Sequence, residues 1–329
     1  MKLIKENYKF LLVIIGLILL FNIHFPYYID APGGISDVSS KIEIDGYKSE
    51  GTFNLAYVKE YRATIPTLLI SLFNKDWKVL KQEEILLDTE DDNSYLLRDK
   101  ILMKESISNA INVAYSYANK NLEIISNEIT ITYISEYSDT NLVVGDIVTY
   151  INENKISSKK EIENIINNSN VGDKLEIKVI NNNKEYYRYA YVVEEENVKK
   201  VGILLSEVRE YQTKPSVKIN TDSNESGSSG GLITALSIYD SLTEKDITNG
   251  LTIVGTGTID LEGNIGSIGG VEYKLKSAVK ENADLFIVPN DENYKEAIKL
   301  KKENNYDIEI VGVSTFEEVI SYLNSIANK

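Results

Sequence analysis

A short turn of serine and glycine residues leads directly into an apolar helix in the last third of the chain. The turn spans residues 226–231 and reads Ser-Gly-Ser-Ser-Gly-Gly, with Leu232 as the first apolar residue after it. A hydroxyl at such a turn lies beside backbone N–H groups without helical partners, at the positive end of the helix dipole. These donors suit an oxyanion formed during acyl transfer or a phosphate group. A flexible loop that caps a helix has the same pattern, so the turn alone leaves three interpretations.

A serine nucleophile needs a base, and the composition restricts which base is available. The 329-residue chain has no cysteine and one histidine, His24, which lies at the end of an N-terminal apolar run. These counts exclude disulfides, thiol catalysis, cysteine-based metal sites and metal sites that need several histidines. The remaining bases are carboxylates and a lysine kept neutral by apolar surroundings.

One lysine of a second predicted helix, residues 270–282, has suitable surroundings. The apolar face of this helix consists of Val271, Leu275, Ala278 and Val279. At 100° per residue, Lys274 lies at the edge of that face, whereas Lys276 and Lys280 point to the opposite side. Desolvation beside an apolar face lowers the pKa of a lysine toward the range of a general base. A lysine in this position is also often a surface residue whose stem covers apolar neighbours.

Three segments together resemble the proteolytic domain of the Lon family. They are Ser-Gly-Ser-Ser-Gly-Gly-Leu at 226–232, Val-Gly-Thr-Gly-Thr-Ile at 254–259, and Gly-x-Ile-Gly-x-Ile-Gly-Gly-Val-x-x-Lys at 263–274. Within that family, the order of the parts is similar to that of bacterial membrane-anchored Lon-like proteases, which contain an anchor, a PDZ domain and a C-terminal protease domain.

The resemblance implies roles for individual residues. Ser229 matches the nucleophile, Lys274 the general base, and Thr256 the threonine whose hydroxyl orients the lysine. The backbone N–H groups of Ser229 and Gly230 would hold the oxyanion. No cofactor and no metal is implied. The implied fold is that of the ribosomal S5 domain 2.

The elements around these residues alternate between strands and helices. Strands are expected over residues 201–208, 216–220, 251–258, 284–289 and 308–313, and helices over 232–242, 270–282, 292–303 and 316–326. Such alternation favours an α/β domain.

The middle of the chain has a different pattern. Residues 141–152 read as a turn and a buried strand, a helix with Ser158 as its N-cap follows, and residues 174–180 and 184–193 form a hairpin. This order resembles the C-terminal half of a PDZ domain from bacterial exported proteases. A PDZ domain would capture an extended peptide at a sheet edge.

The residue pattern of the region before the PDZ-like part predicts short strands and one amphipathic helix. The strands are expected over 41–44, 51–58 and 63–70, and the helix over 104–115.

The first 29 residues have the pattern of a membrane anchor. Three lysines precede an uninterrupted apolar run from Phe10 to Phe21, which extends through Phe25. We expect an uncleaved transmembrane helix, and a cleaved signal peptide is the alternative. In both cases the lysines stay cytoplasmic and the remainder lies outside the membrane.

The sequence thus predicts a mixed α/β (α+β) protein in four parts: an anchor at 1–29, a β-rich region at 30–122, a PDZ-like domain at 123–196 and a Lon-type proteolytic domain at 197–329. The predicted localisation is the cell membrane, as a single-pass protein with a cytoplasmic N-terminus and an extracellular catalytic domain. A formal charge of −15 argues against nucleic-acid binding.

The predicted function is an ATP-independent serine endopeptidase that cleaves exported or membrane-tethered peptides and proteins. The expected partners are an extended peptide or protein substrate and membrane lipid, and a homo-oligomer is left open. Two alternatives remain: a catalytically silent PDZ scaffold, and a small-molecule kinase of galactokinase-like type that uses the Gly/Ser loop for phosphate. No Gly-x4-Gly-Lys-Ser/Thr loop occurs in the sequence.

Overall fold

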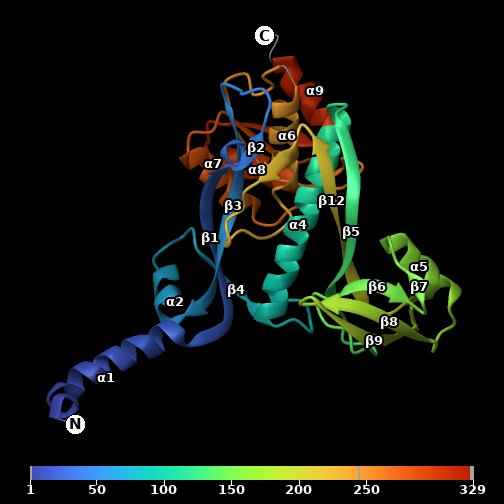
Figure 1. Ribbon diagram of the computed structural model, residues 1–329. Helices are drawn as coiled ribbons and strands as arrows, with labels where there is room; N and C mark the ends of the chain where they lie inside the picture. The colour runs from blue at the N-terminus through green and yellow to red at the C-terminus, as the bar shows by residue number, and fades with distance from the viewer. Residues whose placement is uncertain (1, 244, 327–329) are drawn as a thin grey trace.

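The structure is a computed structural model that describes residues 2–243 and 245–326. It shows a large α/β body, a smaller β-rich lobe, and a helix that projects from the N-terminal end (Figure 1). Two long antiparallel strands, β5 (Asn121–Ile134) and β12 (Ile203–Lys214), run from the body into the lobe (Figure 1). The chain therefore leaves the body through β5, forms the lobe, and returns to the body through β12.

The body is built on one mixed sheet whose strands come from both ends of the chain. The strand order is β18-β17-β14-β3-β1-β4. The bounds are β1 (His24–Asp37), β3 (Thr52–Thr64), β4 (Lys78–Lys81), β14 (Thr252–Gly255), β17 (Leu285–Pro289) and β18 (Glu309–Val313). Strand β14 pairs in parallel with β3 on one side and β17 on the other. Strands of the predicted β-rich region and of the predicted proteolytic domain thus share a single sheet.

Helices cover both faces of this sheet. Those of the body are α4 (Asp92–Tyr117), α6 (Gly231–Leu242), α7 (Val271–Lys280), α8 (Glu292–Asn304) and α9 (Phe316–Ile326). Alternate residues of a strand point to opposite faces. Accordingly, Ile253 packs in the core with α4, α6 and α9, whereas Val254 packs in the core with α7 and α8. Strand β17 is buried along its whole length, as its continuous apolar run predicts.

The lobe contains the predicted hairpin and the predicted helix. Its sheet has the order β12-β5-β6-β8-β9, with β7 paired to β6. The bounds are β6 (Ile147–Ile151), β7 (Asn154–Lys155), α5 (Lys159–Asn168), β8 (Lys174–Asn181), β9 (Lys184–Tyr191), β10 (Val193–Glu195) and β11 (Val198–Lys200). Ser158 caps α5 by accepting a hydrogen bond from the N–H of Glu161, as predicted.

The remaining elements are short, and one of them corrects a prediction. They are η1 (Ser39–Lys41), β2 (Ile42–Ile44), α2 (Ile65–Ser71), α3 (Gln82–Ile85), β13 (Val217–Ile219), β15 (Thr258–Ile259) and β16 (Ile265–Gly266). The strand expected over residues 63–70 is wrong, because β3 ends at Thr64 and α2 begins at Ile65. Thr64 and Thr67 cap each other's backbone N–H groups, and Pro66 suits the first helical turn.

The predicted membrane anchor lies in helix α1 (Lys2–Asn22). The apolar run was expected to continue through Phe25, but the helix ends at Asn22 and His24 already begins β1. Among the residues that the structure describes, no helix is both long and apolar enough to cross a membrane. That this segment crosses a membrane stays a prediction from the sequence.

Candidate active site

The serine turn is held against α4 by two hydrogen bonds. The N–H of Gly227 donates to the carbonyl oxygen of Asp99 at 3.0 Å, and Oγ of Ser106 donates to the carbonyl oxygen of Ser228 at 2.8 Å. A Cβ atom at Gly231 would lie 2.6 Å from Oγ of Ser106, which is too close for any side chain. Glycine at this position therefore lets α4 approach the turn and hold the residue before Ser229.

The N-terminus of α6 presents backbone donors at Ser229. Gly230 is the N-cap of α6 and supplies no side chain to cap the helix. Within residues 2–243 and 245–326, the N–H groups of Ser229 and Gly230 donate no hydrogen bond. These are the two predicted oxyanion donors. Their position at the positive end of the helix dipole suits a developing negative charge on a reacting carbonyl.

The segment after β14 ties Thr256 to Ser229. The carbonyl oxygen of Ser229 accepts a hydrogen bond from the N–H of Gly257 at 2.8 Å and another from Oγ1 of Thr256 at 3.2 Å. The N–H of Leu232 donates in turn to the carbonyl oxygen of Gly257 at 3.1 Å. These hydrogen bonds fix the position of the turn relative to the end of β14, and Thr256 lies directly beside the serine.

Lys274 reaches the same place from α7. Its Nζ atom donates to Oγ1 of Thr256 at 3.0 Å, and its residue surface is only 4% exposed. Burial alone lowers the pKa of Lys274 from 10.5 to about 7. Lys276, on another face of α7, forms ion pairs with Asp76 and Glu272 that hold its pKa above the ordinary value. The helical periodicity thus distinguished the buried lysine from the paired surface lysine.

The structure brings the three predicted residues Ser229, Thr256 and Lys274 together. Thr256 uses its hydroxyl proton for the carbonyl oxygen of Ser229, so its lone pairs accept from Lys274. This directs the ammonium group of Lys274 toward the serine turn. Ser229 itself is partly exposed, so a substrate can reach it, whereas Thr256 and Lys274 are buried. An accessible hydroxyl beside a buried lysine of low pKa is suited to nucleophilic catalysis.

Two features of this site were missed in the sequence. The amphipathic helix predicted over residues 104–115 was given no role in the site, but it forms part of α4, whose Ser106 and Asn109 hold the active-site segments. The side-chain amide of Asn109 donates to the carbonyl oxygen of Ile259 at 3.0 Å. The sequence signal for this role was a row of polar residues spaced three positions apart, Ser106, Asn109 and Asn112. Gly270 precedes α7 with φ +70°, and a Cβ atom there would lie 2.6 Å from Val58. A glycine is therefore needed to start the helix that carries Lys274.

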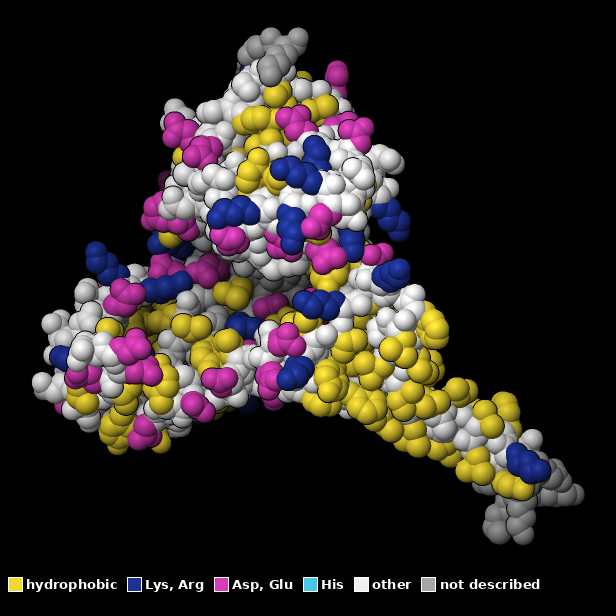
Figure 2. All heavy atoms as spheres, turned by 180° about the vertical axis from the view of Figure 1, so that it is seen from behind, with side chains coloured by type: hydrophobic (Ala, Val, Ile, Leu, Met, Phe, Trp, Pro, Cys, Tyr) yellow, Lys and Arg dark blue, Asp and Glu magenta, His cyan; other side chains and the backbone are white. Residues whose placement is uncertain are grey.

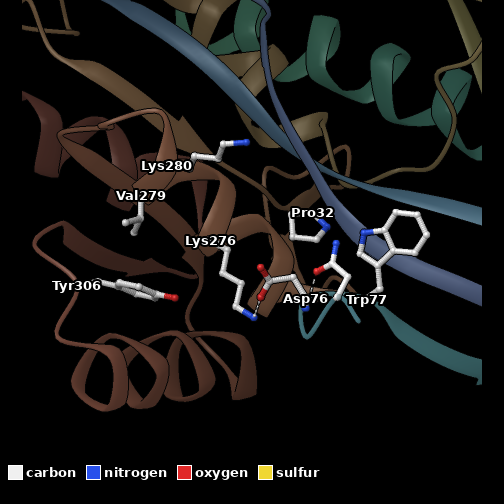
Figure 3. Close-up of a pocket in the computed structure, with 8 residues that line it drawn as sticks. Pro32, Asp76, Trp77, Lys276, Val279, Lys280 and Tyr306 are labelled. Atoms are coloured by element: carbon white, nitrogen blue, oxygen red, sulfur yellow. Dashed lines mark hydrogen bonds and ion pairs between the residues drawn. The ribbon is translucent and has the colours of Figure 1, made fainter. Parts of the chain in front are cut away.

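A surface groove lies on another face of α7, away from this chemistry. It is lined by Asp76 and Trp77 from the loop before β4 and by Lys276, Val279 and Lys280 of α7 (Figure 3). The figure shows Lys276 reaching across to Asp76, so the groove joins α7 to that loop.

Comparison with known proteins finds a family whose match spans Ser229, Thr256 and Lys274. Residues 222–325 match the Lon protease (S16) C-terminal proteolytic domain. Over 100 residues the chain is 34% identical to Lon protease 2 of Borreliella burgdorferi, and over 95 residues it is 35% identical to Lon protease of Aster yellows witches'-broom phytoplasma. These alignments cover 30% and 29% of this chain and 12% of each relative, so the chain spans about an eighth of their length. The predicted similarity of the C-terminal part of the chain to a Lon-type proteolytic domain is thereby confirmed.

Two solved structures are similar to part of the chain. They are the PDZ domain of an SdrC-like protein from Listeria monocytogenes and the second domain of a further Listeria protein. The identities are 22% and 24%, and the TM-scores are 0.22 and 0.21. The similarity covers 23% and 24% of this chain and 85% and 82% of those structures.

Proposed function

We propose that this protein is an ATP-independent serine endopeptidase with Ser229 as nucleophile and Lys274 as general base. The observation that carries the proposal is the buried Nζ atom of Lys274, which donates to Thr256 beside the serine turn. With a pKa of about 7, a large fraction of Lys274 is neutral at physiological pH and has a lone pair for the serine proton.

The reaction would proceed through an acyl-enzyme. Oγ of Ser229 attacks the peptide carbonyl while Nζ of Lys274 accepts the hydroxyl proton. The N–H groups of Ser229 and Gly230 hold the oxyanion of the tetrahedral intermediate. As the C–N bond breaks, Lys274 gives its proton to the leaving amine. A water molecule then attacks the ester, Lys274 takes its proton and returns it to Oγ of Ser229, and the acid product leaves.

The substrates are proposed to be extended segments of exported or membrane-tethered peptides and proteins. ATP independence is part of this proposal, because unfolding by ATP hydrolysis is not expected outside the cell. We further propose that α1 holds the protein at the cell membrane, with a cytoplasmic N-terminus and the catalytic body outside. The lysines that precede the apolar run support this orientation. External protease added to intact cells should then degrade the body.

Incubation with an unfolded protein such as casein tests the catalytic proposal. The full chain in detergent should cleave casein without ATP, and added ATP should not change the rate. Ser229→Ala should abolish cleavage, whereas Ser228→Ala, which keeps the backbone contact to Ser106, should retain a substantial rate. Full activity of the Ser229→Ala variant would exclude Ser229 as the nucleophile. Absence of cleavage together with transfer of phosphate from ATP to a small molecule would favour the kinase alternative.

A further inference from the structure

A second exposed apolar surface lies beside α1, at the end of α2. Leu69, Ile70, Leu72 and Phe73 all expose their side chains, and the last two residues are 77% and 89% exposed. The turn that carries them is ordered by backbone hydrogen bonds, since the N–H groups of Phe73 and Asn74 both donate to the carbonyl oxygen of Ile70. We call residues 69–73 the apolar tip. Such large side chains at the most exposed point of a turn indicate a binding surface.

The apolar tip continues the surface of α1. Helix α1 contacts α2 and β3, so the two apolar segments adjoin. Figure 2 shows hydrophobic side chains running from the projecting helix onto the neighbouring part of the body without a charged interruption. Along α1, consecutive residues from Leu17 to Phe21 are all exposed, so apolar side chains occur on every face of the helix.

This distribution favours a lipid phase as the partner. A protein groove covers one face of a helix, whereas a lipid phase surrounds it, and a helix that is apolar on all sides is suited to the second case. The surroundings of the tip agree with lipid. Tyr61 and Trp77 stack at 5.9 Å between ring centroids, and Lys75 and Lys78 are exposed nearby in the chain. Aromatic rings and lysines of this kind favour the boundary between hydrocarbon and water.

We propose that the apolar tip inserts into a phospholipid bilayer as a second membrane contact beside α1. The proposal concerns how the body meets the membrane, and it does not depend on the peptidase activity. It does depend on the proposed association of α1 with lipid.

The second contact would orient the catalytic body. Asp76, three residues after the tip, forms an ion pair with Lys276 of α7 at 2.8 Å (Figure 3). Lys276 lies two residues from Lys274 on the same helix. One membrane contact allows the body to rotate about α1, whereas two contacts hold α7, and with it the active site, at a constant height above the lipid.

The single tryptophan of the chain reports on the tip directly, because Trp77 lies four residues from Phe73. The full chain is reconstituted into vesicles of phosphatidylcholine and phosphatidylglycerol, with and without brominated acyl chains. Flotation in a density gradient measures association through α1 separately. We expect Trp77 fluorescence to be quenched by the brominated lipid. The double variant Leu72→Ser/Phe73→Ser should lose most of this quenching and still float.

The matched control is Leu204→Ser/Tyr187→Ser, which removes two exposed apolar side chains from β12 and β9 of the lobe. This variant should be quenched as strongly as the unmodified chain. Because all four side chains are exposed, none of the substitutions should alter folding, which circular dichroism checks. Quenching of the tip variant as strong as that of the unmodified chain would overturn the proposal. An unmodified chain that floats but whose Trp77 is not quenched would also overturn it. A dimer that dissociates in the tip variant, without quenching by lipid, would instead make the tip a contact between two copies.

Discussion

The Nζ atom of Lys274 lies 3.0 Å from Oγ1 of Thr256, and both residues are almost completely buried. Among the described residues, no carboxylate forms an ion pair with this lysine, in contrast to Lys276 two positions later. A buried amine without a counter-charge is easier to keep neutral, because burial penalises its charged form. This relationship has consequences for activity and for stability that can be measured.

Activity should rise with pH as Lys274 loses its proton. With a pKa of about 7, the neutral fraction increases about tenfold per pH unit below that value and levels off above it. The pH profile of kcat/KM for a peptide substrate should therefore rise through neutrality to a plateau. Lys274→Arg should be inactive at every pH, because a guanidinium group stays charged.

Lys276→Arg is the control for that substitution. It keeps a cation opposite Asp76 and Glu272 and should change the rate little. An active Lys274→Arg enzyme would show that the lysine is not the base, and the proposed dyad would have to be abandoned.

Stability should also depend on the charge of Lys274. Its folded-state pKa of about 7 lies below the ordinary 10.5, so between these values the unfolded state binds more protons than the folded state. The free energy of unfolding should therefore rise with pH across this window, by at most about 1.4 kcal/mol per unit. Lys274→Met should remove this contribution and stabilise the protein at neutral pH.

Urea unfolding of the unmodified protein and of Lys274→Met near pH 7 and near pH 9 measures this contribution, because the difference between the two proteins isolates Lys274 from other groups. The difference in their free energies of unfolding should be smaller at the higher pH. A difference that is constant with pH would mean that Lys274 keeps its ordinary pKa in the folded state.

Thr256 should act by orienting Lys274 and the serine turn. Thr256→Val keeps the shape of the side chain but removes both the acceptor for Lys274 and the donor to Ser229. We expect kcat to fall by roughly tenfold or more, because two hydrogen bonds of about 1 kcal/mol each are lost. Thr256→Ser retains the hydroxyl and should recover most of the rate. Equal rates for the valine and serine variants would exclude this role.

Ser106 should be a positioning residue for the nucleophile. Its Oγ atom donates to the carbonyl oxygen of Ser228, one residue before Ser229. Ser106→Ala should lower kcat with little change in KM, because the turn loses its contact to α4 while the substrate surface is unchanged. Ser108→Ala is a matched control, since Ser108 is equally buried on α4 but bonds Arg209 instead. Ser108→Ala should lose at least as much stability as Ser106→Ala, measured by thermal unfolding, because Ser108 forms two hydrogen bonds with Arg209, but only Ser106→Ala should lower kcat. Equal kcat values would contradict the positioning role.

The local pattern of apolar and polar residues was sufficient to predict most helices and strands of the last third of the chain. The helix predicted over residues 270–282 is α7, the strand over 284–289 is β17, and the helix over 316–326 is α9. The two helices have clear periodicity because their apolar residues face a core, and the period depends only on the backbone geometry, whereas β17 was indicated by a short continuous apolar run. The same periodicity predicted that Lys274, rather than Lys276, borders the apolar face.

Residue types and their spacing were therefore sufficient to predict the candidate site: a serine turn before a helix, a lysine on an apolar helix face, no cysteine, and a single histidine that lies in the N-terminal apolar segment. Only the tertiary structure decided that β3 pairs with β14, and that Ser106 holds the turn of Ser229. The paired strands lie about two hundred residues apart. Which distant partner satisfies a backbone or hydroxyl group depends on how all elements pack together, and local periodicity contains no information about that choice.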